Sequence, residues 1–197
     1  MLQTNHMPFN FETDIELEND RARIQPLTMV HLEALVPIAT QHPDLVRYSP
    51  SLIHTPELLQ KYITDAMDDR TTHFRYAFAI WDKLTSRYAG STSFANISDK
   101  DGRLEIGYTW LGKDFHGKGL NARVKSLLLD YAFNELGFER VEFKTDERNT
   151  KSRRALEKLG AQYEGCLRSH MLMTDGFRRN SVYYSILKNE WKPESLR

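Results

Sequence analysis

The order of two hydrophobic patterns constrains the fold of this chain more than any other feature of its sequence. Three segments rich in aromatic and β-branched residues, 73–81, 87–97 and 103–111, are separated by the polar turns "DKLTS" and "SDKDG". They predict consecutive strands, and the short turns predict antiparallel pairing. After Gly119 the apolar residues follow the period of a helix, and "RVEFKT" (140–145) alternates again like a strand. The sequence therefore predicts an antiparallel meander followed by a strand–helix–strand unit.

That unit, residues 103–145, predicts one parallel pair of strands with a right-handed crossover. The other predicted elements are a strand over 21–28, helices over 28–39, 56–69 and 149–160, and strands over 161–173 and 178–187. Thr28, Thr55 and Asn149 are the N-caps expected for these three helices. We therefore expect an α/β fold of the mixed α+β kind, with a central, mostly antiparallel sheet of about seven strands and helices on both faces.

Length and composition suit one folded domain. The chain has 197 residues, of which 40% are apolar. Residues 1–20 hold five acids and no Lys or Arg, so they are interpreted as an acidic N-terminal extension. We expect a single domain over 21–191 and a C-terminal tail over 192–197. The lone Cys166, the lack of a signal peptide and the lack of an apolar stretch of membrane-spanning length predict a cytoplasmic protein that does not enter membranes.

Charge is balanced overall but unevenly distributed. Residues 115–197 hold sixteen Lys and Arg against eleven acids. This excess indicates either solvated helix faces or a half of the molecule that binds a small polyanion. No basic run is present, so nucleic acid is not an expected partner. The seven histidines lack the spacing of metal ligands, and no metal is expected.

The stretch "FHGKGLN" (115–121) links the last strand of the meander to the helix. The first N–H groups of a helix have no internal partners and favour an anion. Gly117 and Gly119 would let a phosphate approach the backbone, and Lys118 adds a positive charge. A plain turn before a helix is the alternative interpretation.

The same stretch fits a dinucleotide-binding fingerprint. "GKGLNA" (117–122) matches G-x-G-x-x-A, with Glu142 about twenty residues further on. Residues 112–116 make too long a connection for the tight turn of that motif. The meander before the motif and the scarcity of parallel units after it also argue against a dinucleotide fold.

Four motifs in a fixed order carry a family resemblance. These are "LEIGYTWL" (104–111), "HGKGLN" (116–121), "NTKSRRALEKLGAQYEGCLR" (149–168) and "DGFRRNSVYYSILKNEW" (175–191). The chain resembles the GNAT acyltransferases over roughly 20–190. It is most similar to their RimJ/RimL-type branch, which acetylates amines, including protein N-terminal amines, with acetyl-coenzyme A.

The resemblance implies a binding site for acetyl-CoA. The family's pyrophosphate loop corresponds to His116, Gly117, Lys118, Gly119, Leu120 and Asn121. His116 replaces the usual Arg or Gln, and Asn121 replaces a small residue. The resemblance also implies a splay between the strands 103–111 and 140–145, where the pantetheine arm would bond to the backbone of Tyr108, Thr109, Trp110 and Leu111.

The helix after the second of these strands adds further candidates by resemblance. Asn149 corresponds to the asparagine that contacts the pantetheine arm, although it is also the expected helix cap. Arg154, or its neighbour Arg153, would reach a phosphate of CoA, although both also fit a solvated helix face. Ser152 corresponds to the group that protonates the leaving thiolate, although an ordinary first-turn serine fits equally.

Acetyl transfer to an amine needs a base for the amine proton. Glu105 is the first candidate if it points inward, and a solvent-facing residue is its alternative interpretation. Asp146 and Glu147, just past the neighbouring strand, are rivals. We therefore expect an acetyl-CoA-dependent N-acetyltransferase that works by direct attack in a ternary complex. A non-catalytic CoA-binding module and an NAD-type binder are the alternatives.

The acceptor is expected to be a protein N-terminus or a small-molecule amine. In this family its site is built by the first two helices with their loop (29–70) and by the last two strands. These segments carry the acids Asp44, Asp65, Asp68 and Asp69 and the aromatics Tyr48, Tyr62, Tyr183 and Tyr184. Such residues favour a cationic acceptor. The resemblance further implies a homodimer.

Overall fold

The computed structural model describes residues 7–192. Its strands are β1 (Leu17–Glu18), β2 (Ala22–Pro26), β3 (Arg75–Asp82), β4 (Arg87–Ser98), β5 (Arg103–Leu111), β6 (Arg140–Asp146), β7 (Gln162–Leu172) and β8 (Arg178–Leu187). Its α-helices are α1 (Leu32–Ala39), α2 (Pro56–Thr71), α3 (Leu120–Asp130) and α4 (Thr150–Lys158). Residues 1–6 of the expected N-terminal extension and 193–197 of the expected tail lie outside the described residues.

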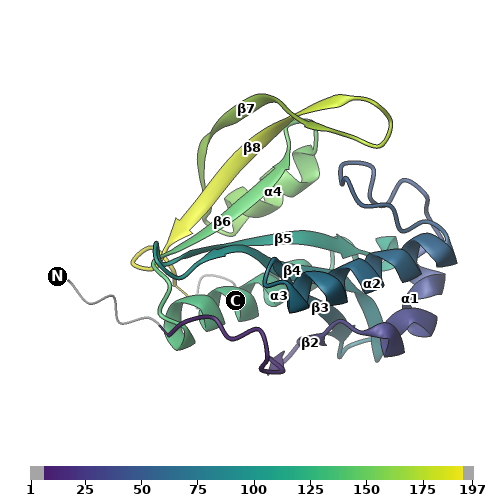
Figure 1. Ribbon diagram of the computed structural model, residues 1–197, viewed down its shortest axis with the longest axis horizontal. Helices are drawn as coiled ribbons and strands as arrows, with labels where there is room; N and C mark the ends of the chain where they lie inside the picture. Colours follow the sequence, from purple (N-terminus) through teal and green to yellow (C-terminus); the bar gives the residue numbers. More distant parts are fainter. Residues whose placement is uncertain (1–6, 193–197) are drawn as a thin grey trace.

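One sheet runs through the molecule in the order β1-β2-β3-β4-β5-β6-β8-β7. Every neighbouring pair is antiparallel except β5 and β6, which are parallel. The mixed, mostly antiparallel sheet is confirmed. It has eight strands in the described part of the chain instead of about seven, because the two-residue strand β1 pairs with β2 (Figure 1).

The parallel pair is short. Arg103, Leu104 and Glu105 pair with Arg140, Val141 and Glu142, and no pairing between β5 and β6 follows. Beyond these residues β5 continues beside β4, and β6 continues beside β8. In Figure 1 the two parts of the sheet diverge from this closed end as a V. The predicted splay is thus present, and we call the part made of β6, β8 and β7 the C-terminal wall.

Helices cover both faces of the sheet, as predicted. Tyr62 of α2 contacts Ser91 of β4, with 3.4 Å between their hydroxyl oxygens. Tyr131, directly after α3, stacks on Phe94, which lies three residues further along β4. Residues an odd number apart on a strand face opposite sides. The helices α1 and α2 therefore lie on one face and α3 on the other (Figure 1).

The helix after the glycine-rich loop is less regular than predicted. The α-helix α3 ends at Asp130, and a π-helical turn over Tyr131–Glu135 continues the chain. Leu136 N–H donates to Tyr131 O at 2.9 Å, the spacing of a π-turn. Gly137 then takes a left-handed conformation (φ 78°), as expected for the residue that ends a helix.

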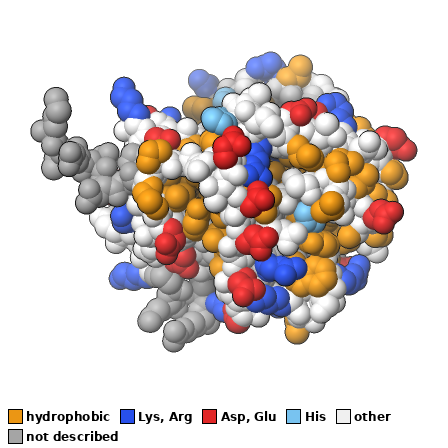
Figure 2. Space-filling model, turned by 60° about the horizontal axis from the view of Figure 1, so that its bottom comes forward, with side chains coloured by type: hydrophobic (Ala, Val, Ile, Leu, Met, Phe, Trp, Pro, Cys, Tyr) orange, Lys and Arg blue, Asp and Glu red, His pale blue; other side chains and the backbone are white. Residues whose placement is uncertain are grey.

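The described part of the acidic segment, residues 7–20, packs on this sheet. Phe9, Phe11 and Ile15 are buried in the core. The Tyr76 hydroxyl donates to Thr13 O at 2.8 Å and accepts from Ile15 N–H at 2.9 Å. On the face shown in Figure 2, acidic and basic side chains are interspersed. No helix within residues 7–192 has the length and apolarity needed to cross a bilayer.

Candidate active site

The gap between β5 and β6 begins where Glu105 and Glu142 end the parallel pairing. From Ile106 to Leu111 the edge of β5 that faces β6 makes no strand pairing. Within this stretch a bulge lies opposite Ser91 and Ser93 of β4, and Tyr108 adopts a left-handed conformation (φ 52°). A bulge of this kind turns backbone groups away from the regular ladder. Backbone of the predicted range Tyr108–Leu111 therefore lacks strand pairing to β6, although Tyr108 O accepts from Tyr62 and Leu111 O from His116.

The side chains of these residues are held mainly on the β4 side. Arg75 of β3 lies over the Tyr108 ring, 4.3 Å from its centroid. Thr109 Oγ1 and Thr92 Oγ1 share a hydrogen bond of 2.8 Å. The side chain of Trp110 is buried. Because the side chains are fixed elsewhere, the backbone is what these residues offer to a ligand in the gap.

The glycine-rich loop forms an open N-terminus for α3. Gly117 (φ 72°) and Gly119 (φ 81°) both adopt left-handed conformations that disfavour other residues. A Cβ atom at either glycine would meet nothing within 4 Å, so the loop is open on its outer side. The first bond of the helix runs from Arg123 N–H to Gly119 O at 3.2 Å. The N–H groups of residues 120–122 are thus left without intrahelical partners, as an anion site requires.

His116 fastens this loop to two elements. Its Nε2 lies 2.7 Å from Leu111 O at the end of β5, and its Nδ1 lies 2.7 Å from Lys151 Nζ in α4. An ammonium group only donates, so Nδ1 accepts and Nε2–H donates to Leu111, which makes the ring neutral. Burial, and then the charge of Lys151, lower the pKa of His116. His116 is thus a neutral anchor of the loop, with both ring nitrogens engaged.

The other loop residues take different positions. Leu120 is fully buried under the loop, and Lys118 is exposed. Asn121 lies on the first turn of α3, with its Oδ1 buried and without a hydrogen-bond partner among the described residues. One turn further, the buried Lys125 extends to β6, where its Nζ lies 5.2 Å from the centroid of the Phe143 ring. Phe143 pairs with Tyr184 of β8 and is the first residue of β6 beyond its pairing with β5.

The first turn of α4 lies beside the glycine-rich loop, since Lys151 Nζ lies 2.7 Å from His116 Nδ1. Asn149 caps the helix, since its Oδ1 accepts from Ser152 N–H at 3.1 Å. Its oxygen is therefore engaged, as its alternative role predicts. Arg153 donates to the Tyr184 hydroxyl at 3.1 Å and to Glu147 O at 3.3 Å. Arg154 is exposed. Of the two arginines, Arg154 is thus the one directed to solvent, where a phosphate has access to it.

Glu105 points inward and is 4% exposed. Its Oε2 accepts from Asn96 Nδ2 at 2.6 Å and from Lys144 Nζ at 3.3 Å. Its Oε1 lies alongside Gly107, where a Cβ atom would come within 2.8 Å of it. The carboxylate therefore leans along β5 toward the bulge, with one oxygen held and the other left beside the open gap.

A cavity of about 380 Å³ opens at this carboxylate. It is lined by Asn96, Ile97, Ser98, Arg103, Glu105, Glu142 and Tyr183. Asn96 faces it because β4 bulges between Ala95 and Ser98 and Asn96 takes a left-handed conformation (φ 48°). Such cavities, with a few convergent polar groups, are typical of small-ligand sites.

The rival bases are less available. Asp146 is fully buried, and both of its oxygens accept from Arg148. Burial alone would raise its pKa, but the Arg148 hydrogen bonds outweigh burial and hold the pKa below its ordinary value. Glu147 Oε2 accepts from Asn180 at 2.9 Å. Glu105 is therefore the acid in this group that has both a cavity and an uncommitted oxygen.

The acids expected at the acceptor side are largely paired. Asp44 binds Lys113 at 2.8 Å, Asp65 binds Lys61 at 2.7 Å, and Asp69 binds Arg75 at 2.9 Å. Asp68 is exposed on α2. Of the aromatics, Tyr62 reaches toward Tyr108 O (3.4 Å), while Tyr183 lines the cavity at Glu105. Tyr184 lies on the opposite side of β8, where it contacts α4. The Arg148 guanidinium lies over the Tyr48 ring, 5.6 Å from the ring centroid.

Three side chains of this region were not candidates from the sequence. Asn96 contacts Glu105 only because a bulge reverses the direction of its side chain. Lys144 contacts Glu105 only because β6 lies beside β5. Lys125 lies at a buried position of α3, and a lysine there does not indicate burial in the sequence. The signal available for Lys125 was its position: it follows the apolar Val124 on the face that carries Leu128.

The dinucleotide interpretation does not fit this arrangement. Glu142 is the third residue of β6 and binds Arg140 at 2.8 Å. In a dinucleotide fold the acidic residue lies at the carboxyl end of its strand, near the glycine-rich turn. Here the carboxyl end of β6 is Asp146. Within residues 7–192, no group of three or more His, Cys, Asp or Glu side chains is placed to hold a metal ion.

Comparisons with known proteins agree with this geometry. The model of the acetyltransferase (GNAT) domain matches residues 21–162. YdaF of Bacillus subtilis (strain 168), named "Putative ribosomal N-acetyltransferase YdaF", is 39% identical over 105 residues, which is 53% of this chain and 56% of YdaF. The chain thus matches little more than half of that relative.

Two further similarities extend over most of the chain. Spermidine N(1)-acetyltransferase of Escherichia coli (strain K12) is 30% identical over 144 residues, 73% of this chain and 72% of that protein. The crystal structure of a GCN5-related N-acetyltransferase from Brucella melitensis is 26% identical, with a TM-score of 0.84 over 95% of this chain and 85% of that one. The splayed sheet, the glycine-rich loop and these matches agree, and the chain belongs to the GNAT family of N-acetyltransferases.

Proposed function

We propose that this protein is an acetyl-CoA-dependent N-acetyltransferase in which an amine attacks the thioester directly, in a ternary complex of enzyme, acetyl-CoA and acceptor. The observation that carries the proposal is the position of Glu105. Its carboxylate is buried at the closed end of the splay, with Oε2 held by Asn96 and Lys144 and Oε1 free beside Gly107.

The residues around the gap fit coenzyme A. The unpaired N–H groups at the start of α3, with Gly117 and Gly119, would hold the pyrophosphate, and the exposed Lys118 adds a charge. The backbone of 108–111, apart from the engaged Tyr108 O and Leu111 O, would bond to the pantetheine arm. The orphaned Asn121 Oδ1 at this helix start is an acceptor, so it would pair with an N–H or O–H donor of the ligand and not with a phosphate oxygen. Arg154 would meet a phosphate at the surface.

In the reaction, the acceptor nitrogen forms a bond to the acetyl carbonyl carbon and the C–S bond breaks. Glu105 takes the proton that the amine loses, either directly or through a water molecule. Ser152, in the first turn of α4, is the proposed donor of the proton that the thiolate gains, and its hydroxyl takes up a replacement proton from solvent. Backbone N–H groups at the β5 bulge would stabilise the oxyanion.

The names of the relatives indicate the acceptor only as a broad chemical class. One relative is named a putative ribosomal N-acetyltransferase and another a spermidine N(1)-acetyltransferase, and both names support an amine acceptor. We propose the RimJ/RimL-type branch on the four ordered motifs. The cytoplasmic location stays an expectation of the sequence, and the homodimer stays an expectation of the resemblance.

Calorimetry with acetyl-CoA and a thiol-release screen over amines and short peptides test this proposal together. We expect micromolar binding of acetyl-CoA and amine-dependent thiol release. Tight CoA binding without release for any amine would favour the non-catalytic module. An absence of CoA binding at high micromolar concentration would overturn the proposed function.

A further inference from the structure

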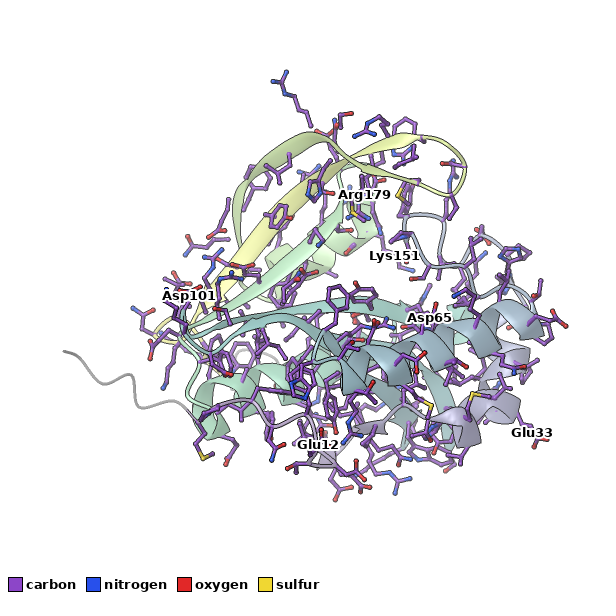
Figure 3. The ribbon with its side chains drawn as sticks, in the orientation of Figure 1. Glu12, Glu33, Asp65, Asp101, Lys151 and Arg179 are labelled. Atoms are coloured by element: carbon purple, nitrogen blue, oxygen red, sulfur yellow. The ribbon has the colours of Figure 1, made fainter. Side chains whose placement is uncertain are left out.

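The C-terminal wall presents a polar face to the inside of the V. Lys144 and Asp146 of β6 lie on the same face as Arg179, Ser181, Tyr183 and Ser185 of β8, because Lys144 pairs with Tyr183 and Asp146 with Ser181. Arg179, Ser181, Asp146 and Ser185 are all less than 5% exposed. Figure 3 shows Arg179 on this wall, above β5. Buried polar side chains on a sheet face indicate a site for a polar ligand when their partners are incomplete.

Most charges near this face are neutralised in pairs. Lys144 pairs with Glu105, and Arg75 pairs with Asp69. Asp146 Oδ1 accepts from Arg148 N–H and Nε, and Asp146 Oδ2 accepts from Arg148 Nη2 at 2.7 Å. The Asp146 carboxylate is therefore committed to Arg148.

Arg179 is the exception. It is 4% exposed, and its hydrogen bonds go to neutral oxygens: Nε donates to Ser181 Oγ and Nη1 to Tyr48 O, both at 3.0 Å. Among the described residues it has no carboxylate within 4 Å, and its Nη2 makes no hydrogen bond. Burial lowers the pKa of Arg179, although Asp146 and Glu105 act in the opposite direction. A buried guanidinium held only by neutral acceptors is costly, and an anionic ligand would offset that cost.

A hollow lies along β7, the strand that pairs with β8. It has a volume of about 820 Å³ and is lined by Cys166, Leu167, Arg168, Ser169 and His170 of β7. His170 Nδ1 lies 3.0 Å from Ser181 Oγ, the atom that accepts from Arg179 Nε. The Ser181 hydroxyl thus links Arg179 to His170, a lining residue of the hollow, whereas Arg179 itself does not line it.

We propose that the acceptor amine of this protein also carries an anionic group, a carboxylate in its simplest form, and that Arg179 binds this group while Glu105 receives the amine. The inference rests on the proposed function, because it assigns the acceptor of the same site. It departs from the cationic acceptor favoured by the acid count, since Asp44, Asp65 and Asp69 are each paired with a lysine or arginine.

Arg179 also tethers the loop between α1 and α2 through Tyr48 O, so the test must separate its charge from its hydrogen bond. Arg179→Gln retains an N–H donor and removes the charge, and Arg179→Lys retains the charge. Arg178→Gln is the matched control, because Arg178 is exposed and bonds to Ser169 instead. Each protein is assayed for acetyl-CoA thiol release with 4-aminobutanoate, 1-aminobutane and spermidine.

For the wild type and Arg178→Gln, we expect kcat/KM to be at least ten-fold higher for 4-aminobutanoate than for 1-aminobutane, mainly through KM. In Arg179→Gln this ratio should fall toward one, and Arg179→Lys should restore part of it. Calorimetry of 4-aminobutanoate with the CoA-loaded wild type gives a readout independent of turnover. Equal or better use of 1-aminobutane or spermidine by the wild type, or no binding of 4-aminobutanoate, would overturn the proposal. Lack of thiol release with every amine, despite binding of 4-aminobutanoate, would instead count against the proposed function.

Discussion

Asn96 donates its side-chain amide to Glu105 Oε2 at 2.6 Å from a left-handed backbone conformation (φ 48°). Asparagine tolerates this conformation better than most residues, although it still costs free energy. The strained bulge of β4 turns Asn96 to the face on which Glu105 lies. The bulge thus supplies a second support for the carboxylate, in addition to Lys144.

Replacing Asn96 should lower turnover, because the Glu105 carboxylate loses one of its two hydrogen-bond donors. We expect both Asn96→Ala and Asn96→Gly to reduce kcat about ten-fold, with CoA affinity unchanged, since a hydrogen bond to a charged group stabilises by roughly 1.5–3 kcal/mol. Asn96→Gly should unfold at a higher temperature than Asn96→Ala, because glycine accepts positive φ. A loss of turnover in the alanine variant alone would assign the effect to the backbone.

Glu105→Gln should lower kcat by about 10²–10³, the range for loss of a general base, and leave the Kd for CoA within two-fold. Thiol release and calorimetry measure the two quantities. Glu142→Gln is the control, since Glu142 lines the same cavity but binds Arg140. Equal turnover in the Glu105 variant and the wild type would move the base elsewhere.

Gly119→Val should weaken CoA binding by at least ten-fold. A β-branched residue resists the left-handed conformation of Gly119 (φ 81°) and would occupy the open side of the loop. Gly160→Val carries a similar strain (φ 92°), also with nothing within 4 Å, at the end of α4. The two variants should lose comparable thermal stability, and only Gly119→Val should lose CoA affinity. Equal CoA affinity in both variants would reduce the loop to a turn.

His116 should titrate below its ordinary value of 6.5, since burial and the charge of Lys151 lower its pKa. Where the unfolded chain binds a proton that the folded chain refuses, stability rises with pH. The contribution of His116 is therefore complete above about pH 6.5 and is lost as the pH falls through its lowered pKa. In Lys151→Met, NMR titration should show a higher pKa for His116. An unchanged titration would contradict the contact between the two side chains.

Lys125→Met should stabilise the free protein by about 1–3 kcal/mol, because it replaces a buried ammonium with an apolar side chain of similar length. Burial lowers the pKa of Lys125 to about 8, from an ordinary value of 10.5. The stability of the wild type should therefore rise between about pH 8 and pH 10.5, and this slope should be smaller in Lys125→Met. Thermal unfolding measures both effects, and the exposed Lys158→Met is the control. A less stable Lys125→Met would show that the ammonium contributes more than its burial costs.

Local patterns accounted for most of the fold. The segments 87–97, 103–111 and 178–187 alternate clearly and became β4, β5 and β8 within one residue. The two-residue strand β1 is too short to leave a pattern. The acids of residues 7–20 concealed the burial of Phe9 and Phe11, because the acids that follow them, from Glu12 to Asp20, are exposed.

The candidate site was predictable where it depends on residues close in sequence. The loop at 116–121 follows from its motif, whereas alternation along 103–111 left the direction of Glu105 open. The partners of Glu105 and the isolation of Arg179 do not follow from local patterns, because Lys144 and Tyr48 lie 39 and 131 residues away from the side chains that they contact. Strand pairing and bulges set these contacts, and neither is encoded in a short stretch.

The three residue pairs between β5 and β6 also have a consequence for local opening. Residues 140–187 form one continuous stretch that contains the whole C-terminal wall and α4. Segments joined to the rest of a protein by few hydrogen bonds open as cooperative units below the global unfolding free energy. We therefore expect the amide hydrogens of this stretch to exchange together, and faster than those of β3 and β4. A ligand that bridges the gap should slow the exchange of this stretch.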